Sequence, residues 1–143
     1  MTLTLSAPAA RTASRVMHAA PYVTISYDEA RHWLYADWHG PVCSEEVMTG
    51  ALRALDVLHR QPVSRVLNDN TRLCGLWADA AIWCAEELLP QLYAAGCRHL
   101  GWVYSPDIYS KLSAELLVER TAAGVTIQTF DNLQAARDWL ENT

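Results

Sequence analysis

The chain has 143 residues, of which 51% are hydrophobic and 19% are charged, and its formal net charge is -5. This length and composition are typical of one compact globular domain and exclude a disordered chain. Binding to nucleic acid or to an anionic membrane surface is disfavoured, because both need a cluster of Lys and Arg that the sequence does not contain. No apolar run approaches the roughly 20 residues of a membrane-spanning helix, so we expect no membrane partner.

The cysteine and histidine spacing indicates neither a metal site nor a redox motif. The 4 cysteines form no CxxC pair and have no tight Cys/His ligand spacing. We therefore expect no metal and no cofactor. Because no secretory leader is recognisable, the thiols are interpreted as reduced, in a cytoplasmic bacterial protein.

Residues 1–20 differ in composition from the rest of the chain. They are rich in Ala, Ser and Thr and contain no acid, which fits a transit peptide as well as a poorly ordered tail. We interpret residues 1–20 as an N-terminal extension and residues 21–143 as the domain. Residues 2–6 alternate like a strand, which predicts docking either on the chain's own domain or on a neighbouring subunit. This alternation is a first indication of a homodimer.

The domain opens with a predicted hairpin. Val23, Ile25 and Tyr27 alternate with polar residues, the period of a half-buried strand. A polar turn over residues 28–31 precedes a second strand predicted over residues 33–38. The two strands are therefore expected to pair antiparallel.

Helices and strands alternate after the hairpin. Ser44 is a suitable N-cap, and the helix that it opens ends before Pro62. The next predicted strand covers residues 63–68. A second helix, capped by Asp79, contains Pro90, so a kink or break is predicted just before that proline.

The last third of the chain repeats this alternation. Residues 99–104 are almost wholly apolar, which predicts a central strand buried on both faces. Residues 105–107 have the cap, proline and acid of a helix start, and this third helix is expected to reach Ala123. Residues 125–130 suit an edge strand, and a capping box at Asp131 opens the last helix.

The predicted order is strand, strand, helix, strand, helix, strand, helix, strand, helix. Successive strand–helix–strand units demand a parallel sheet with right-handed crossovers. The sequence therefore predicts an α/β domain with a five-stranded mixed sheet, mostly parallel with an antiparallel first strand, and four main helices.

Short motifs in this order add a family resemblance. The motifs are Leu67-Asn68-Asp69-Asn70, a helix with Trp83 and Pro90, Ala94-Ala95-Gly96, and Phe130 to Leu133 followed by Ala136 to Leu140. Together they resemble the SpoIIAA-like fold of STAS domains, and more closely the small bacterial STAS/Sec14-like proteins. The resemblance covers roughly residues 21–141 and implies the SpoIIAA-like fold, without an assigned biochemical activity.

The better-known relatives imply two different roles. STAS anti-anti-sigma switches carry a phosphorylatable Ser directly after an Asp at the start of the second helix. Here Asp79 is followed by Ala80, so the nucleophilic oxygen is missing and a phosphoswitch is disfavoured. Sec14-like relatives enclose a lipid or another apolar molecule, although this chain is short for a deep cavity.

Polar and aromatic residues gather where the predicted strands end. The carboxyl end of a strand opens onto the ligand crevice in α/β sheets, although Asn and Asp at such positions also suit a turn. The 6 tryptophans of the chain suit a pocket wall as well as a core. The predicted ligand- or partner-binding site comprises Asn68, Asp69, Asn70, Cys74, Trp77 and Tyr104.

These features favour a non-catalytic regulatory or binding module, homodimeric, whose exposed loop 69–79 contacts a protein partner or a small ligand. The alternative is a carrier or sensor of a small apolar ligand. A second alternative is a small enzyme that combines the cluster at residues 68–70 with Cys43 or Cys74. Cys43 lies at a helix start, a position where reactive thiols are found, whereas Cys74 has no identifiable base.

Overall fold

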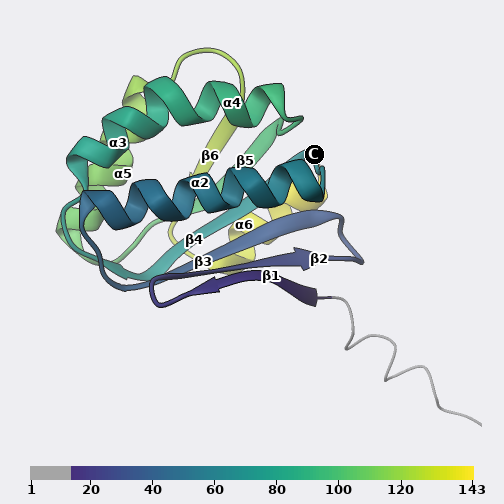
Figure 1. The fold of residues 1–143 in the computed structure, drawn as a ribbon, viewed down its shortest axis with the longest axis horizontal. Coiled ribbons are helices and arrows are strands. Elements are labelled where there is room, and N and C mark those ends of the chain that lie inside the picture. Colours follow the sequence, from purple (N-terminus) through teal and green to yellow (C-terminus); the bar gives the residue numbers. More distant parts are fainter. Residues whose placement is uncertain (1–13) are drawn as a thin grey trace, which may run out of the picture.

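The computed structural model describes residues 14–143 as one sheet with helices on both faces (Figure 1). The strand predicted over residues 2–6 lies outside the described residues. The elements in chain order are β1 (Ser14–Ala20), β2 (Val23–Asp28), β3 (Trp33–Pro41), α2 (Ser44–Arg60), β4 (Arg65–Cys74), α3 (Ala78–Trp83), the π-helical turn η1 (Cys84–Leu88), α4 (Leu89–Ala94), β5 (His99–Val103), α5 (Ile108–Arg120), β6 (Thr126–Phe130) and α6 (Leu133–Glu141).

The sheet is mixed, with the strand order β1-β2-β3-β4-β5-β6. β2 pairs antiparallel with both β1 and β3, whereas the pairs from β3 to β6 are parallel. This arrangement confirms the α/β class and the mixed, mostly parallel sheet. The predicted number of five strands was wrong, because β1 adds a sixth at the edge.

β1 comes from the segment that the sequence interpretation placed in the N-terminal extension. It pairs with β2 of its own chain, so this part of the segment docks in cis. Its residues are mostly exposed, and the pairing register shifts between Val16 and His18. A strand without a buried face and with an irregular register shows no alternation of apolar and polar residues in its sequence. The composition of residues 1–20 was therefore misleading, because part of that segment is a strand of the sheet.

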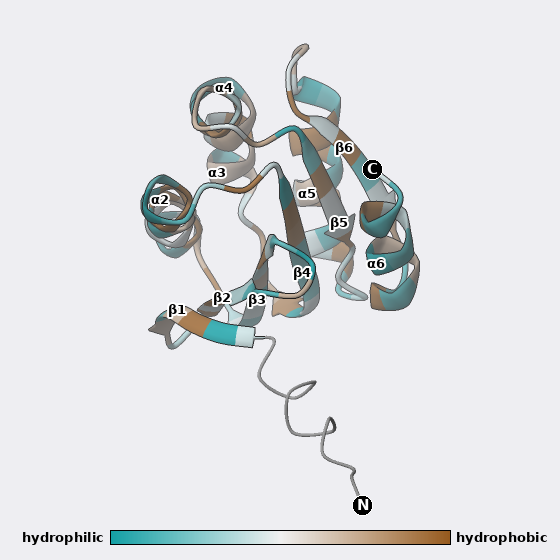
Figure 2. Ribbon diagram, turned by 90° about the vertical axis from the view of Figure 1, so that its right-hand side faces the viewer, coloured by the Kyte–Doolittle hydropathy of each residue, from teal (hydrophilic) through white to brown (hydrophobic). Residues whose placement is uncertain are grey.

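Helices cover the sheet on both sides, with α2, α3 and α4 on one face and α6 on the other (Figure 2). The larger core cluster joins residues of α2, α3, α4 and α5 to the sheet residues Leu100 and Trp102. A smaller cluster joins Ala136 and Leu140 of α6 to Leu67. Because successive strand residues point to opposite faces, neighbours in β4 and β5 contribute to different clusters.

β4 continues well past its predicted end at residue 68. Its last residues pair with β3, after a register irregularity between Asp37 and His39. On its other side β5 stops at Val103, opposite Asp69. The polar cluster at residues 68–70 therefore lies inside β4, at the level where β5 ends.

The helix after β4 is a continuous helical run with one irregular turn. α3 leads into η1, which leads directly into α4. Pro90 has no N–H to donate to the preceding turn, and η1 lies immediately before that position. The sequence predicted a kink or a break before Pro90, and the structure instead has this π-helical turn within an unbroken run.

Several helix boundaries differ from the predictions by one to three residues. Neighbouring residues cap α2, α3 and α6 in place of the predicted Ser44, Asp79 and Asp131, and α5 ends at Arg120 rather than near Ala123. The observed N-caps are Cys43, Trp77, Asp107 and Asn132.

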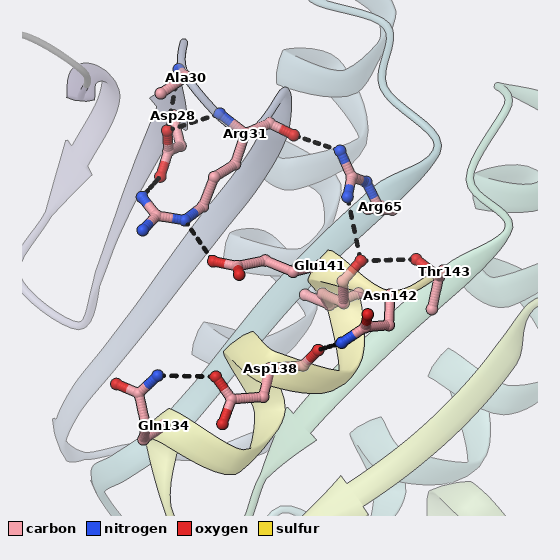
Figure 3. A network of polar contacts seen from close by, with 10 residues as sticks. Asp28, Ala30, Arg31, Arg65, Gln134, Asp138, Glu141, Asn142 and Thr143 are labelled. Atoms are coloured by element: carbon pink, nitrogen blue, oxygen red, sulfur yellow. Dashed lines mark hydrogen bonds and ion pairs between the residues drawn. The ribbon is translucent and has the colours of Figure 1, made fainter.

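A network around Arg65 holds α6 against the sheet (Figure 3). The Arg65 guanidinium donates to the carbonyl of Leu140 over 3.0 Å and to the carbonyl of Arg31. Arg31 in turn pairs with Glu141 at 2.8 Å. The Leu140 carbonyl also accepts from the Thr143 hydroxyl over 2.7 Å, and a cation at the last turn of α6 complements the helix dipole. This network therefore joins the β2–β3 turn, β4 and α6.

Arg65→Ala should therefore destabilise the domain by about 1–3 kcal/mol, because it leaves two carbonyls without their charged donor. Arg53→Ala is the matched control, since Arg53 makes only an exposed ion pair with Asp56 and such pairs contribute little. Urea unfolding of both variants measures the difference. Equal stability of the two variants would contradict a structural role for the network.

Candidate functional site

The pleat of β4 divides the predicted polar cluster between the two faces of the sheet. Asn68 and Asn70 lie on the face covered by α2 to α5, and the Asn68 amide donates to Asn70 Oδ1 over 3.1 Å. The Oδ1 atom of Asn68 accepts from Trp38 Nε1 over 2.9 Å. Asp69 lies on the opposite face, so the three residues do not act as one site.

Asn68 and Asn70 border a cavity of about 70 Å³ between the sheet and the helices. Three tryptophans contribute to its wall, Trp38 from β3, Trp102 from β5 and Trp77 from the start of α3. The other bordering side chains are apolar or sulfur-containing, as Cys84, Leu88 and Leu117 are. The cavity is therefore an apolar, aromatic space with two amides at one side.

Trp77 is held in this wall by α5. Its backbone N–H donates to Ser113 Oγ over 3.0 Å, and its indole Nε1 donates to Ser110 Oγ over 3.1 Å. Its ring stacks on Trp102, with 6.3 Å between the centroids and 28° between the planes. Both serines are fully buried, so the aromatic wall is positioned by neutral hydrogen bonds inside the core.

Trp102 differs from its two aromatic neighbours in its hydrogen bonding. Its Nε1 is the only buried side-chain nitrogen or oxygen within residues 14–143 that has no hydrogen-bond partner. The side chain is 7% exposed and borders the cavity. Leaving a buried donor unsatisfied costs about 1–3 kcal/mol, and buried Trp N–H groups usually find an acceptor. A tryptophan that borders the cavity therefore carries an unused hydrogen-bond donor.

Asp69 belongs to a separate polar cluster beside α6. Tyr35 donates its hydroxyl to Asp69 Oδ2 over 2.7 Å, and Asp69 Oδ1 accepts from the Thr71 backbone over 2.9 Å. Burial and the hydrogen bond to Asp69 raise the pKa of Tyr35 above its ordinary value. The carboxylate is thus engaged by its own neighbours, which is the role of a structural Asp.

Cys74 and Tyr104 lie apart from the cavity. Cys74 ends β4 opposite Pro41, and Tyr104 follows β5 with the Lys111 ammonium 5.1 Å from its ring centroid. The expected contact loop 69–79 is also shorter than predicted, because β4 fills it up to residue 74 and α3 begins at residue 78. Of the six predicted site residues, the structure brings Asn68, Asn70 and Trp77 together around one cavity.

Sequence reasoning missed the two strand tryptophans of the cavity. Trp102 pairs with Asn68 across the β4–β5 ladder, and Trp38 donates to the same amide. Their shared face follows from strand pairing between segments far apart in the chain. The only signal in the sequence was the high tryptophan count.

Metal-binding and membrane-spanning features are absent from the described part of the chain. Residues 14–143 contain no group of three or more His, Cys, Asp or Glu side chains that could hold a metal ion. No helix in that range has the length and apolar character needed to cross a bilayer.

A comparison with solved structures shows a similar fold. No family model and no curated protein matches the chain. The crystal structure of an uncharacterised protein of the DUF3478 family from Shewanella loihica PV-4, with a SpoIIAA-like fold, superposes with a TM-score of 0.54 at 18% sequence identity. The match covers 87% of this chain and 98% of that one. The chain therefore has the SpoIIAA-like fold that its sequence motifs predicted.

Proposed function

We propose that this protein is a non-catalytic binding module for a small, mainly apolar molecule that carries one hydrogen-bond acceptor. The observation that carries the proposal is the buried, unpartnered Nε1 of Trp102, a residue that borders an aromatic cavity. A carbonyl or ether oxygen in the cavity would accept from this donor, while Trp77 and Trp38 would contact the apolar part of the ligand.

The size of the cavity restricts what enters without movement. It measures about 70 Å³, whereas a cavity of about 150 Å³ accepts benzene. A larger ligand must displace a wall. The wall formed by η1, with Cys84 and Leu88, is the best candidate, because its backbone departs from the regular α-helical pattern next to Pro90 and such turns are frequent at functional sites.

The arrangement of the thiols favours binding over catalysis. Cys43 caps α2 and Cys74 ends β4, and neither borders the cavity. The thiol that does border it is Cys84, whose pKa is raised to about 12 by burial. A protonated thiol is a poor nucleophile, so Cys84 serves as an apolar wall residue in this proposal.

Binding is tested with two probes of the same shape, cyclopentanone and methylenecyclopentane, titrated into ¹⁵N-labelled protein. Both have six heavy atoms, as benzene does, so both must displace the η1 wall to the same extent. We expect the ketone to bind about three- to tenfold more tightly, because only its oxygen accepts from Trp102. The Nε1–H resonance of Trp102 should shift with the ketone alone. Equal affinity of the two probes, or no shift of any cavity indole, would refute the proposal.

The unsatisfied state of Trp102 is tested by comparing Trp77→Phe with Trp102→Phe. Both variants lose the same indole-to-phenyl volume beside the same cavity, but only Trp77→Phe breaks a hydrogen bond. Trp77→Phe should therefore be less stable than Trp102→Phe by about 1–3 kcal/mol in urea unfolding. Equal losses would mean that the Trp102 donor is satisfied in solution.

Thiol reactivity provides a further check on the absence of catalysis. Burial raises the pKa of Cys84 and of Cys97 to about 12, so both stay protonated at pH 8. Iodoacetamide should alkylate the exposed Cys43 first, and peptide mass spectrometry gives the order. Fast alkylation of Cys84 at neutral pH would instead reopen the enzyme alternative.

A further inference from the structure

Helix α5 carries apolar side chains on its solvent face as well as on its buried face. Ile108, Tyr109 and Leu112 are 64%, 58% and 52% exposed, and Leu76, in the segment before α3, is 59% exposed. A surface helix ordinarily presents polar residues to water. We call these four residues the α5 patch. They are four of the seven large hydrophobic residues that are exposed within residues 14–143.

The α5 patch is continuous with a shallow groove between the start of α3 and α5. Leu76 and Leu112 border this groove together with Leu116, and two carboxylates, Glu115 and Glu119, border its far end. The surface along α5 is thus apolar at the α5 patch and acidic at the far end of the groove.

Charged side chains beside the patch have no ion-pair partner in the described chain. None of the ion pairs formed within residues 14–143 involves Lys111, Glu115 or Glu119. Lys111 and Glu115 are one helical turn apart and lie on the same flank of α5. The surface therefore offers two carboxylates and the ammonium of Lys111, which lies 5.1 Å from the Tyr104 ring centroid, next to exposed apolar side chains.

We propose that a second copy of this chain covers the α5 patch, with the two α5 helices antiparallel about a twofold axis at Leu112. A twofold interface must be self-complementary, and this surface meets that condition. In this arrangement Leu112 of one copy meets Leu112 of the other, and Ile108 lies at the level of Leu116 in the second copy.

The charges fit the same arrangement. At a rise of about 1.5 Å per residue, Lys111 of one copy lies about 3 Å along the axis from Glu115 of the other, on the same flank. Opposite charges therefore meet twice across the axis, once for each copy.

A membrane surface fits the patch less well than a second copy does. The patch is bordered by Glu115 and Glu119, which anionic headgroups would repel, and membrane-bound amphipathic helices instead carry Lys and Arg on their polar face. The apolar contact is small for a stable dimer, so we expect a dissociation constant in the micromolar range. This inference does not depend on the ligand proposal.

Sedimentation velocity of the full chain between about 5 and 300 µM tests the proposal. We expect a reversible monomer–dimer equilibrium. Leu112→Glu, which places two carboxylates at the axis, should raise the dimer dissociation constant by about 100-fold or more. The matched control is Leu52→Glu on α2, which is also exposed, at 41%, but lies outside the patch, and it should leave the equilibrium unchanged. Circular dichroism verifies that both variants are folded.

The antiparallel register has its own test. Lys111→Glu should weaken the dimer several-fold, and Lys111→Glu combined with Glu115→Lys should restore it, because the swapped charges meet again across the axis. The proposal is overturned if the chain stays monomeric up to 300 µM. This holds also if the α5 patch is then found to bind a different protein. A dimer that Leu112→Glu and Leu52→Glu affect equally also overturns the proposal.

Discussion

The two-sided burial of β4 is the constraint on which the rest of this structure depends. β4 bonds to β3 on one side and to β5 on the other, and helices cover both of its faces. Its pleat sends Leu67 and Asp69 toward α6, and Asn68 and Asn70 toward the larger core. A shift of one residue in its register would exchange these two sets. The cavity therefore exists only in this register.

The side-chain amides of Asn68 and Asn70 lie inside an apolar layer, where a polar group without a hydrogen-bond partner costs free energy. Asn68 is compensated by Trp38 and by Asn70, and Trp77 is compensated by buried serines of α5. The same network leaves Trp102 Nε1 without an acceptor. Native cores satisfy nearly all of their buried polar groups. The unsatisfied Trp102 donor beside the cavity is therefore a better guide to a candidate ligand site than the polar side chains that already have partners.

α5 links the interior of the molecule to its surface. Ser110 and Ser113 on its inner side hold the aromatic wall of the cavity, while Ile108 and Leu112 face solvent. One helix therefore supports both proposals, ligand binding on the inside and self-association on the outside. An occupant that shifted Trp77 would act directly on the helix that carries the α5 patch.

The sequence by itself determined the α/β class, the mixed sheet and the four helices, because each depends on residues close together in the chain. It also excluded the usual phosphorylated Ser, since Ala80 follows Asp79. Only the tertiary structure decided that β1 joins the sheet and that Asn68 lies beside Trp102 and away from Asp69. Strand order and register depend on contacts between distant segments, and local periodicity contains no information about which strands become neighbours.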